Sequence, residues 1–307
     1  MPSGQVDDDT ALINSYGKKI LINTDVLVEG IHFSDATTSP EDVGWKAIMA
    51  NVSDLASSGV EEILGITVGM ITPANTQWFW IENLYNGMQK ALKKYGGNII
   101  GGDCSCGQQK VIAISAIGTL GKLHLHRSNA IDGDCLIASG PHGLSRLGLA
   151  LLLSDPLANK NKLSKTLKEK AINAHKRPEA PIDALQALIS CKPKELPWRA
   201  AGTDSSDGLF EAIYSLCESS NCQAVLNPKE LPRDIHWPIG SHWDKWCLEG
   251  GEDFELIASL PPIWAKALVE KFPTSRIIGF MKSGPPKIMW SNGNELKKEK
   301  LLDFKHF

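Results

Sequence analysis

No apolar run in the sequence approaches the roughly 20 residues that a membrane-spanning helix needs. The first ten residues, Met1–Thr10, are polar and acidic, unlike a secretory leader. The seven cysteines show no paired metal-ligand spacing and are odd in number, which favours reduced thiols over a disulfide framework. The net charge of −3 argues against a nucleic-acid partner. These absences together predict a cytoplasmic protein with no membrane or nucleic-acid partner.

Several common catalytic signatures are also missing. The sequence has no G-x-x-x-x-G-K-[ST] phosphate-binding loop and no kinase-type glycine-rich loop with H-R-D. It has no Ser-His-Asp, G-x-S-x-G or H-E-x-x-H pattern, so acyl transfer and zinc hydrolysis lose support. A bound nucleotide would therefore have to be held mainly through metal ions.

The 307 residues are enough for two domains, and 42% of them are hydrophobic, as in an ordinary globular enzyme. Strands and helices alternate in an order that predicts an α+β fold rather than a doubly wound parallel sheet. A helix is expected over 40–58, with Ser39 as its cap and Gly59 as its end, and a helical, lysine-rich, exposed stretch over 154–187. A short strand is expected over 98–101. The domain boundary is predicted within 121–134, giving domains 1–125 and 126–307.

Aspartates recur where an apolar strand or helix meets a loop. Five segments share this design: Asp7–Asp8–Asp9, Thr24–Asp25, Ser53–Asp54, Gly101–Gly102–Asp103 and Asp204–Ser205–Ser206–Asp207–Gly208. A single aspartate of this kind is usually a turn former or a helix cap. Five together favour a magnesium site, because Mg²⁺ takes hard oxygen ligands and often bridges carboxylates to substrate phosphates.

Asp54 is the aspartate that a structural role explains least well. It interrupts an otherwise apolar helical face (Ala50, Val52, Leu55, Ala56), where a charge is costly unless it is paired or bound to metal.

Two other motifs are better explained by structural roles. Cys104 and Cys106 are expected to be small packing residues. His124–Leu125–His126 alternates like a strand with one polar face, and this interpretation is favoured over a metal role.

The motifs resemble, in order, those of the thiamine-monophosphate kinase family. The matching stretches are 8–12, 23–33 (Asn-Thr-Asp-Val-Leu-Val-Glu-Gly-Ile-His-Phe), 44–47, 51–59, 101–103, 206–209, 250–256 and 304–307. The resemblance covers nearly the whole chain, and the T-D-x-L-V-E-G-x-H-F string is its most specific part.

The resemblance implies roles for individual residues. The implied magnesium ligands are Asp9, Asn23, Thr24, Asp25, Asp54, Asp103, Asp204 and Asp207, and three of these, Asp54, Asp103 and Asp207, are the implied catalytic residues. The implied nucleotide contacts are Tyr95, Gly102, Asp103, Arg127 and Ser206, and the implied contacts to thiamine phosphate are His32, Glu252 and Phe304.

The implied chemistry is transfer of the ATP γ-phosphoryl group to thiamine monophosphate, directly and in line, with several Mg²⁺ ions. The acceptor is already an oxyanion, so no strong general base is required, and positioning and electrostatics carry the catalysis. The resemblance also implies a two-domain, PurM-like fold of the aminoimidazole-ribonucleotide-synthetase-like superfamily, with mixed or antiparallel sheets flanked by helices. It further implies a homodimer in which the first domains pair their sheets.

The chain departs from the family pattern at several points. Asp7 replaces a usual glycine, and Cys104-Ser105-Cys106-Gly107 replaces Thr-Thr-Arg-Gly, which removes an arginine from the phosphate corner. Some twenty residues that usually precede the first motif are missing. Two alternatives therefore remain: another ATP-dependent synthetase of the superfamily, making selenophosphate or aminoimidazole ribonucleotide, or a catalytically silent nucleotide- and metal-binding homologue. Selenophosphate synthesis usually needs a reactive cysteine or selenocysteine near the N-terminus, and no cysteine precedes Cys104.

Overall fold

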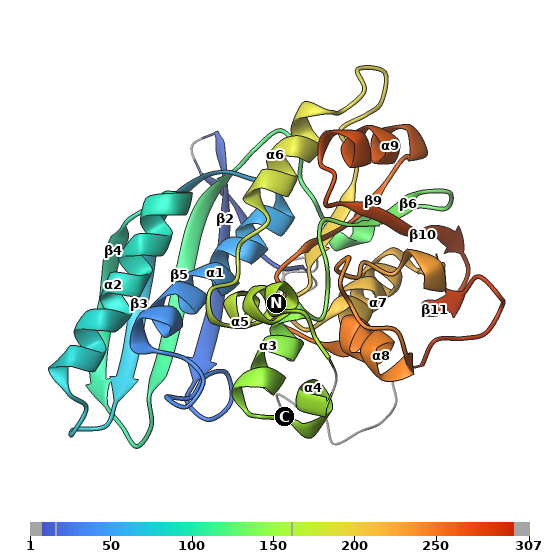
Figure 1. Ribbon diagram of the computed structural model, residues 1–307. Helices are drawn as coiled ribbons and strands as arrows, with labels where there is room; N and C mark the ends of the chain where they lie inside the picture. The colour runs from blue at the N-terminus through green and yellow to red at the C-terminus, as the bar shows by residue number, and fades with distance from the viewer. Residues whose placement is uncertain (1–7, 16, 161, 298–307) are drawn as a thin grey trace.

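The computed structural model describes residues 8–15, 17–160 and 162–297, and it contains two β-sheets with helices packed between and around them (Figure 1). The first sheet has the order β1-β2-β5-β3-β4. Its strands are β1 (Ala11–Ser15), β2 (Lys18–Val28), β3 (Val60–Thr72), β4 (Ile99–Cys106) and β5 (Val111–Leu120). Neighbouring strands are antiparallel except for β3 and β4, which are parallel. The sheet is therefore mixed and mainly antiparallel, which agrees with the predicted α+β fold.

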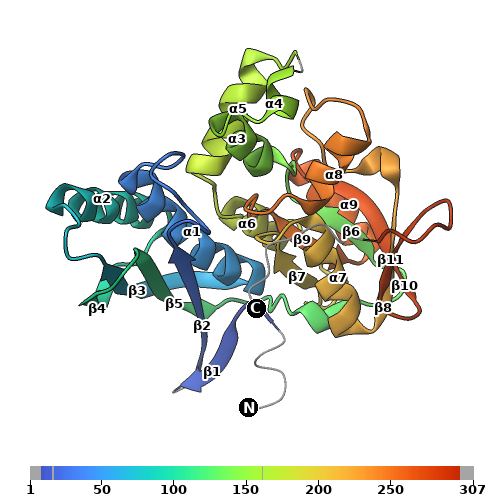
Figure 2. The same ribbon diagram turned by 90° about the horizontal axis from the view of Figure 1, so that it is seen from below.

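Two helices cover one face of this sheet, α1 (Pro40–Ser58) and α2 (Trp78–Tyr95), and among the described residues none covers the other face (Figure 2). The predicted helix over 40–58 is confirmed at both ends. The Ser39 hydroxyl accepts a hydrogen bond from the backbone N–H of Asp42, and Gly59 ends the helix in the left-handed conformation.

Glycine allows α1 and α2 to approach each other closely. A Cβ added to Gly44 would lie 1.9 Å from the carbonyl oxygen of Leu84, and one added to Gly87 would lie 1.9 Å from that of Glu41. Only residues without a side chain fit at these two positions. This contact fixes the position of α1, the helix that carries Asp54.

The second sheet has the order β11-β8-β10-β6-β9-β7. Its strands are β6 (Cys135–Ala138), β7 (Ala201–Asp204), β8 (Cys222–Leu226), β9 (Leu256–Leu260), β10 (Arg276–Ser283) and β11 (Lys287–Trp290). Its neighbouring strands are antiparallel except for β8 and β11. The helices of this half are α3 (Leu144–Leu152), α4 (Pro156–Lys160), α5 (Lys165–Lys176), α6 (Ile182–Ser190), α7 (Leu209–Ser220), α8 (Ser241–Glu249) and α9 (Pro262–Lys271).

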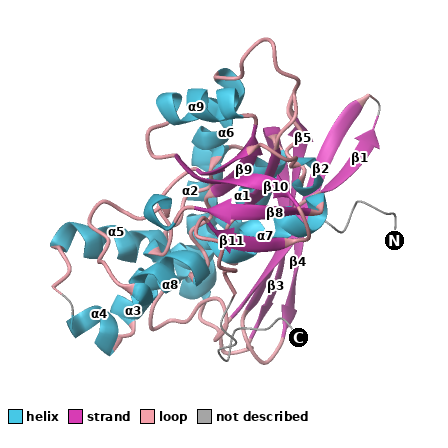
Figure 3. Cartoon of the chain, turned by 90° about the vertical axis from the view of Figure 1, so that its right-hand side faces the viewer, coloured by secondary structure: helices cyan, strands magenta, loops and turns pink. Residues whose placement is uncertain are grey.

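Helices α3, α4, α5 and α8 gather at one side of the molecule around a small core of their own (Figure 3). Trp243 and Trp246 of α8 belong to this core, together with Trp237. Among the described residues, no helix is both long and apolar enough to cross a membrane.

Some predicted elements differ from the structure. The helical stretch expected over 154–187 is divided into α4, α5 and α6, and Pro178 and Pro181 lie between α5 and α6 because proline disrupts a helix interior. The strand expected over 98–101 is longer and continues to Cys106, paired in parallel with β3. The two sheets draw on residues 11–120 and 135–290, and the boundary at 125/126 stays a prediction.

Helix α1 lies between the two sheets. It contacts β2, β3 and β5 of the first sheet and β7 and β9 of the second. Residues from both halves of the chain therefore meet along α1 near Asp54.

Candidate active site

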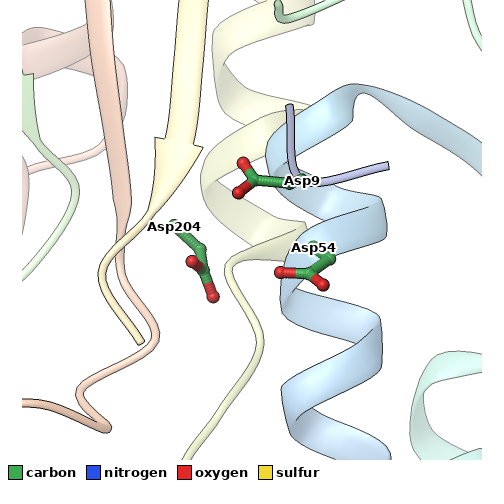
Figure 4. A group of neighbouring side chains, drawn as sticks. All are labelled: Asp9, Asp54 and Asp204. Atoms are coloured by element: carbon green, nitrogen blue, oxygen red, sulfur yellow. The ribbon is translucent and has the colours of Figure 1, made fainter. Parts of the chain in front are cut away.

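Three aspartates from distant parts of the chain meet beside α1. Asp9 lies just before β1, Asp54 is on α1, and Asp204 is the last residue of β7 (Figure 4). One carboxylate oxygen from each lies within 4.8 Å of the others. This carboxylate cluster, Asp9, Asp54 and Asp204, is the centre of the candidate site.

Neighbouring polar side chains fix the orientation of these carboxylates. The hydroxyls of Ser53 and Ser206 donate to the two oxygens of Asp204 at 2.7 and 2.8 Å. The amide nitrogen of Asn23 donates to Oδ2 of Asp54 at 2.8 Å and lies 3.5 Å from Oδ2 of Asp25. Asn23 and Asp25 therefore extend the cluster on the first sheet.

Arg127 is the cation that contacts the cluster directly. Its guanidinium pairs with Asp9 and donates to the Thr203 hydroxyl at 3.1 Å, and its backbone N–H donates to Oδ1 of Asp8 at 3.3 Å. Arg127 belongs to a single 3₁₀ turn, residues Arg127–Asn129, that follows the first sheet. The connection between the two sheets thus carries a positive charge into the cluster.

The acidic groups are crowded beyond what one arginine can neutralise. Burial, followed by the repulsion of neighbouring carboxylates, raises the pKa of Asp9 to about 8 and that of Asp25 to about 6. The same causes raise the pKa of Asp54 well above its usual value, and burial raises the pKa of Asp204. Oδ2 of Asp9 and Oδ1 of Asn23 are buried, and neither has a hydrogen-bond partner among the described residues. Hard oxygen donors with unmet charge fit a divalent cation such as Mg²⁺.

We expect the stabilisation of the protein by Mg²⁺ to grow as the pH rises from about 5 to about 8. A carboxyl whose folded pKa lies above its unfolded value of 3.8 binds more protons when folded, so metal-free stability falls as pH rises toward the folded values. Bound Mg²⁺ requires the deprotonated carboxylates and removes that loss. Thermal unfolding with and without Mg²⁺, at pH 5 and at pH 8, measures the rise in Tm that Mg²⁺ causes. Groups that titrate far from the cluster affect both measurements equally and cancel in this difference. A Mg²⁺-induced rise in Tm that is equal at both pH values, or larger at the lower one, would contradict this.

Two predicted metal ligands lie on the opposite face of the first sheet. Thr24 alternates with Asn23 and Asp25, and its hydroxyl contacts that of Ser115 on β5 at 2.7 Å. Asp103 on β4 is exposed and pairs with Gly69 of β3. Strands β5 and β3 separate β2 from β4, so Asp103 lies about 14 Å from β2 along the sheet. Within one chain Asp103 does not join the carboxylate cluster.

The loop that follows β7 carries Ser206 and Asp207. Ser206 bonds Asp204, and the exposed Asp207 is close enough to raise the pKa of Asp25 by repulsion. The structure therefore groups Asp9, Asn23, Asp25, Asp54, Asp204, Asp207, Arg127 and Ser206 on one side of the sheet.

The residues predicted to contact thiamine phosphate lie in different places. His32 is in the loop after β2, where its Nδ1 accepts the backbone N–H of Val28 at 3.0 Å. Glu252 has a positive φ of 64° and pairs with Nζ of Lys46 at 2.9 Å, while Nδ1 of His175 lies 3.6 Å away. Phe304, like Asp7, lies outside the described residues.

Sequence reasoning missed Lys46, whose side chain on α1 is only 1% exposed. The signal in the sequence was its position in the 44–47 stretch, two residues after Gly44, because that stretch matches a motif of the family.

The predicted nucleotide contacts divide between two places. Gly102 is on β4, and a Cβ there would lie 2.1 Å from the carbonyl oxygen of Val68. Tyr95, at the end of α2, lines a cavity of about 520 Å³ with Ile63, Lys122 and residues of α6. Tyr85, which was not predicted, interacts through its hydroxyl with Cys104, the neighbour of Asp103. Tyr85 is therefore an aromatic residue beside the Gly-Gly-Asp segment of the same chain.

Comparison with known proteins decides the family. A sequence model described as "AIR synthase related protein, N-terminal domain" matches residues 7–120. The thiamine-monophosphate kinase of Prochlorococcus marinus is 58% identical over 100% of this chain and 92% of its own length. That of Synechococcus elongatus is 38% identical over 92% of this chain and 86% of its own. The chain belongs to the thiamine-monophosphate kinase family.

A solved structure of this kinase family agrees with the fold. "AaThiL complexed with AMPPCP and TMP" has a TM-score of 0.81 and 28% identity, and the match covers 96% of this chain and 91% of that one. The predicted α+β, PurM-like fold and the predicted family are thus confirmed.

Proposed function

We propose that this chain transfers the γ-phosphoryl group of ATP to thiamine monophosphate at the carboxylate cluster, forming thiamine diphosphate and ADP. The observation that carries the proposal is the meeting of the carboxylates of Asp9, Asp54 and Asp204, with Asp25 beside them. Burial raises the pKa of all four groups, and repulsion between neighbouring carboxylates raises those of Asp9, Asp25 and Asp54 further. Its support from relatives is the family membership and the related structure that holds an ATP analogue together with TMP.

The proposed Mg²⁺ ligands on this side of the sheet are Asp9, Asn23, Asp25, Asp54, Asp204 and Asp207. When bound, the ions would neutralise the polyphosphate and the charge that develops on the transferred group. Asp54 is central, because it faces carboxylates from both halves of the chain.

The residues of this chain supply the remaining positioning. Arg127 presents a planar guanidinium that can hold phosphate oxygens bidentately once Asp9 has bound metal. Ser206 and the backbone at Gly102 are the proposed nucleotide contacts. Of Tyr85 and Tyr95, Tyr85 is the one that contacts the segment of Gly102, through Cys104. The acceptor oxygen is already anionic, so direct in-line attack needs no base from the protein.

Glu252 is the proposed contact to thiamine, whose thiazolium ring is cationic. Its left-handed backbone and its ion pair with buried Lys46 hold the carboxylate at a set position while leaving it 30% exposed. A fixed anion with one open side suits a cationic ring.

We expect Glu252→Gln to raise the KM for thiamine monophosphate by about tenfold and to leave the KM for ATP unchanged, because the charge opposite the thiazolium is lost. The variant should also have a lower Tm, because buried Lys46 loses its anionic partner. Steady-state kinetics with each substrate varied in turn measures the two constants. Glu249→Gln, three residues earlier on α8, is the matched control. Equal rises in both KM values would instead indicate a general loss of structure.

We further propose that the open face of the first sheet pairs with a second copy of the chain. Val26, Ile71 and Ile100 are 45%, 39% and 57% exposed in this sheet, and such a surface is costly in water. Asp103 of a second copy could then approach Thr24, which Asp103 of the same chain does not reach.

We expect wild type to sediment as a dimer and Val26→Asp to shift it toward the monomer, because the new charge would be buried at the interface. Lys229→Asp, at an exposed position in the second half of the chain, is the control. Sedimentation velocity distinguishes the two species. A wild-type monomer across the accessible concentration range would contradict the pairing.

A further inference from the structure

A second group of metal-binding side chains lies beside the carboxylate cluster. His124 and His126 follow the first sheet, and both direct Nε2 toward Oδ2 of Asp8, at 4.0 and 3.6 Å. The two rings are edge to face, with centroids 5.4 Å apart. The intervening Leu125 is buried, so the alternation that the sequence shows places both rings on one side.

The carboxylate between these rings is unsatisfied. The side chain of Asp8 is 1% exposed, and its Oδ2 has no hydrogen-bond partner among the described residues. Its other oxygen accepts the backbone N–H of Arg127. A buried, unpartnered oxygen aimed at two imidazoles is a costly arrangement unless a cation completes it.

We propose that Asp8, His124 and His126 form a site for a divalent transition metal of the Zn²⁺ class, separate from the magnesium ligands. Imidazole nitrogen suits zinc and its neighbours, whereas Mg²⁺ prefers oxygen. Bonds of about 2.0 Å in a tetrahedron place ligand atoms about 3.3 Å apart. Each Nε2 therefore has to move less than about 1 Å toward Asp8. The two Nε2 atoms also have to approach each other, because the three ligand atoms do not all lie within 4.8 Å of one another, and the fourth position is left for water.

The hydrogen bonds around His126 are compatible with ligation. Its Nδ1 accepts the backbone N–H of Ser128 at 3.2 Å and lies 2.8 Å from the Ser128 hydroxyl. When Nε2 binds metal, the ring proton moves to Nδ1 and is donated to that hydroxyl, a partner of the kind that orients metal-bound histidines. The backbone N–H of Ser128 then loses Nδ1 as its acceptor, but Ser128 is exposed and this N–H can donate to water.

The site would tie two functional segments together. Asp8 precedes Asp9, and His126 precedes Arg127, so a metal here would cross-link the segments whose side chains form the Asp9–Arg127 ion pair. The structure therefore predicts a metal-dependent rise in thermal stability in addition to the effect of Mg²⁺.

The test uses the full chain with Cys104→Ser and Cys106→Ser, so that exposed thiols do not bind the probe, in saturating Mg²⁺ to occupy the carboxylate cluster. Titration with Co²⁺ is followed by the visible absorption of four-coordinate cobalt, and Zn²⁺ is then added to displace it. We expect one equivalent to bind and to raise the Tm. His124→Gln and His126→Gln should each weaken binding at least tenfold, and His236→Gln, an exposed histidine elsewhere, should not.

Two results would overturn the proposal: no binding in saturating Mg²⁺, or equal affinity in the His124 and His126 variants. Far-UV circular dichroism establishes that each variant is folded. Each histidine is replaced in a separate variant. If one variant misfolds, the other still tests the proposal.

Discussion

Replacing Asp54 with asparagine is expected to lower kcat for thiamine diphosphate formation by about 10³-fold or more, while the metal-free protein becomes more stable at neutral pH. The loss follows because Asp54 faces carboxylates from both halves of the chain, and removing one such electrostatic contributor costs 10²–10³-fold or more. The gain follows because burial and repulsion disfavour its charge, as its raised pKa indicates.

A lower kcat together with a higher metal-free stability distinguishes a metal ligand from a structural residue, because loss of a structural residue would lower both. Asparagine can still accept the hydrogen bond from Asn23, so the local packing is kept. Asp183→Asn, an exposed aspartate on α6, is the matched control and should change neither quantity appreciably. Steady-state kinetics and thermal unfolding in EDTA measure both. Lower stability together with lower activity would contradict the assignment of Asp54.

Replacing Arg127 with alanine is expected to lower kcat/KM for ATP by about 10²–10³-fold, with little recovery in Arg127→Lys. Lysine keeps the charge but loses the planar fork that the bidentate contact requires. Without Mg²⁺ the alanine variant should also be less stable, because Asp9 then lies buried beside other carboxylates with no cation. Added Mg²⁺ should restore that stability but not the activity.

Arg199→Ala provides the comparison for Arg127→Ala. Arg199 forms a half-buried ion pair at 2.5 Å with Asp134, which immediately precedes β6, and Nη1 of Arg199 also donates to the carbonyl of Asn129 at the end of the Arg127 turn. Its removal should lower the Tm irrespective of Mg²⁺ and leave the KM for ATP of the folded protein unchanged. If the two variants lost activity in proportion to stability, Arg127 would be a structural residue only.

The sequence predicted elements whose signals are local. The helix over 40–58 has its cap, its first-turn acids and its terminal glycine within the segment itself. The extension of β4 to Cys106 could not be read locally, because that strand is formed by pairing with β3. The break between α5 and α6 in the 154–187 stretch coincides with Pro178 and Pro181, which are a local signal in the sequence.

The grouping of site residues was predictable only in part. Shared chemistry pointed to Asp9, Asp25, Asp54 and Asp204 as one set, and the structure brings them together. Which face a strand residue occupies depends on its alternation and its sheet partners, and this placed Thr24 and Asp103 away from that set. Lys46 was missed because a buried lysine shows itself only through its partner Glu252, 206 residues later in the chain.

The central claim is that the carboxylate cluster transfers phosphoryl groups from ATP to thiamine monophosphate with Mg²⁺. The most direct test follows thiamine diphosphate and ADP as wild-type protein is incubated with both substrates over a range of Mg²⁺ concentrations. The account predicts equal amounts of the two products, formed only with divalent metal and only when the acceptor carries its phosphate. Absence of thiamine diphosphate despite measurable ATP binding, or formation of it unchanged in EDTA, would contradict the account.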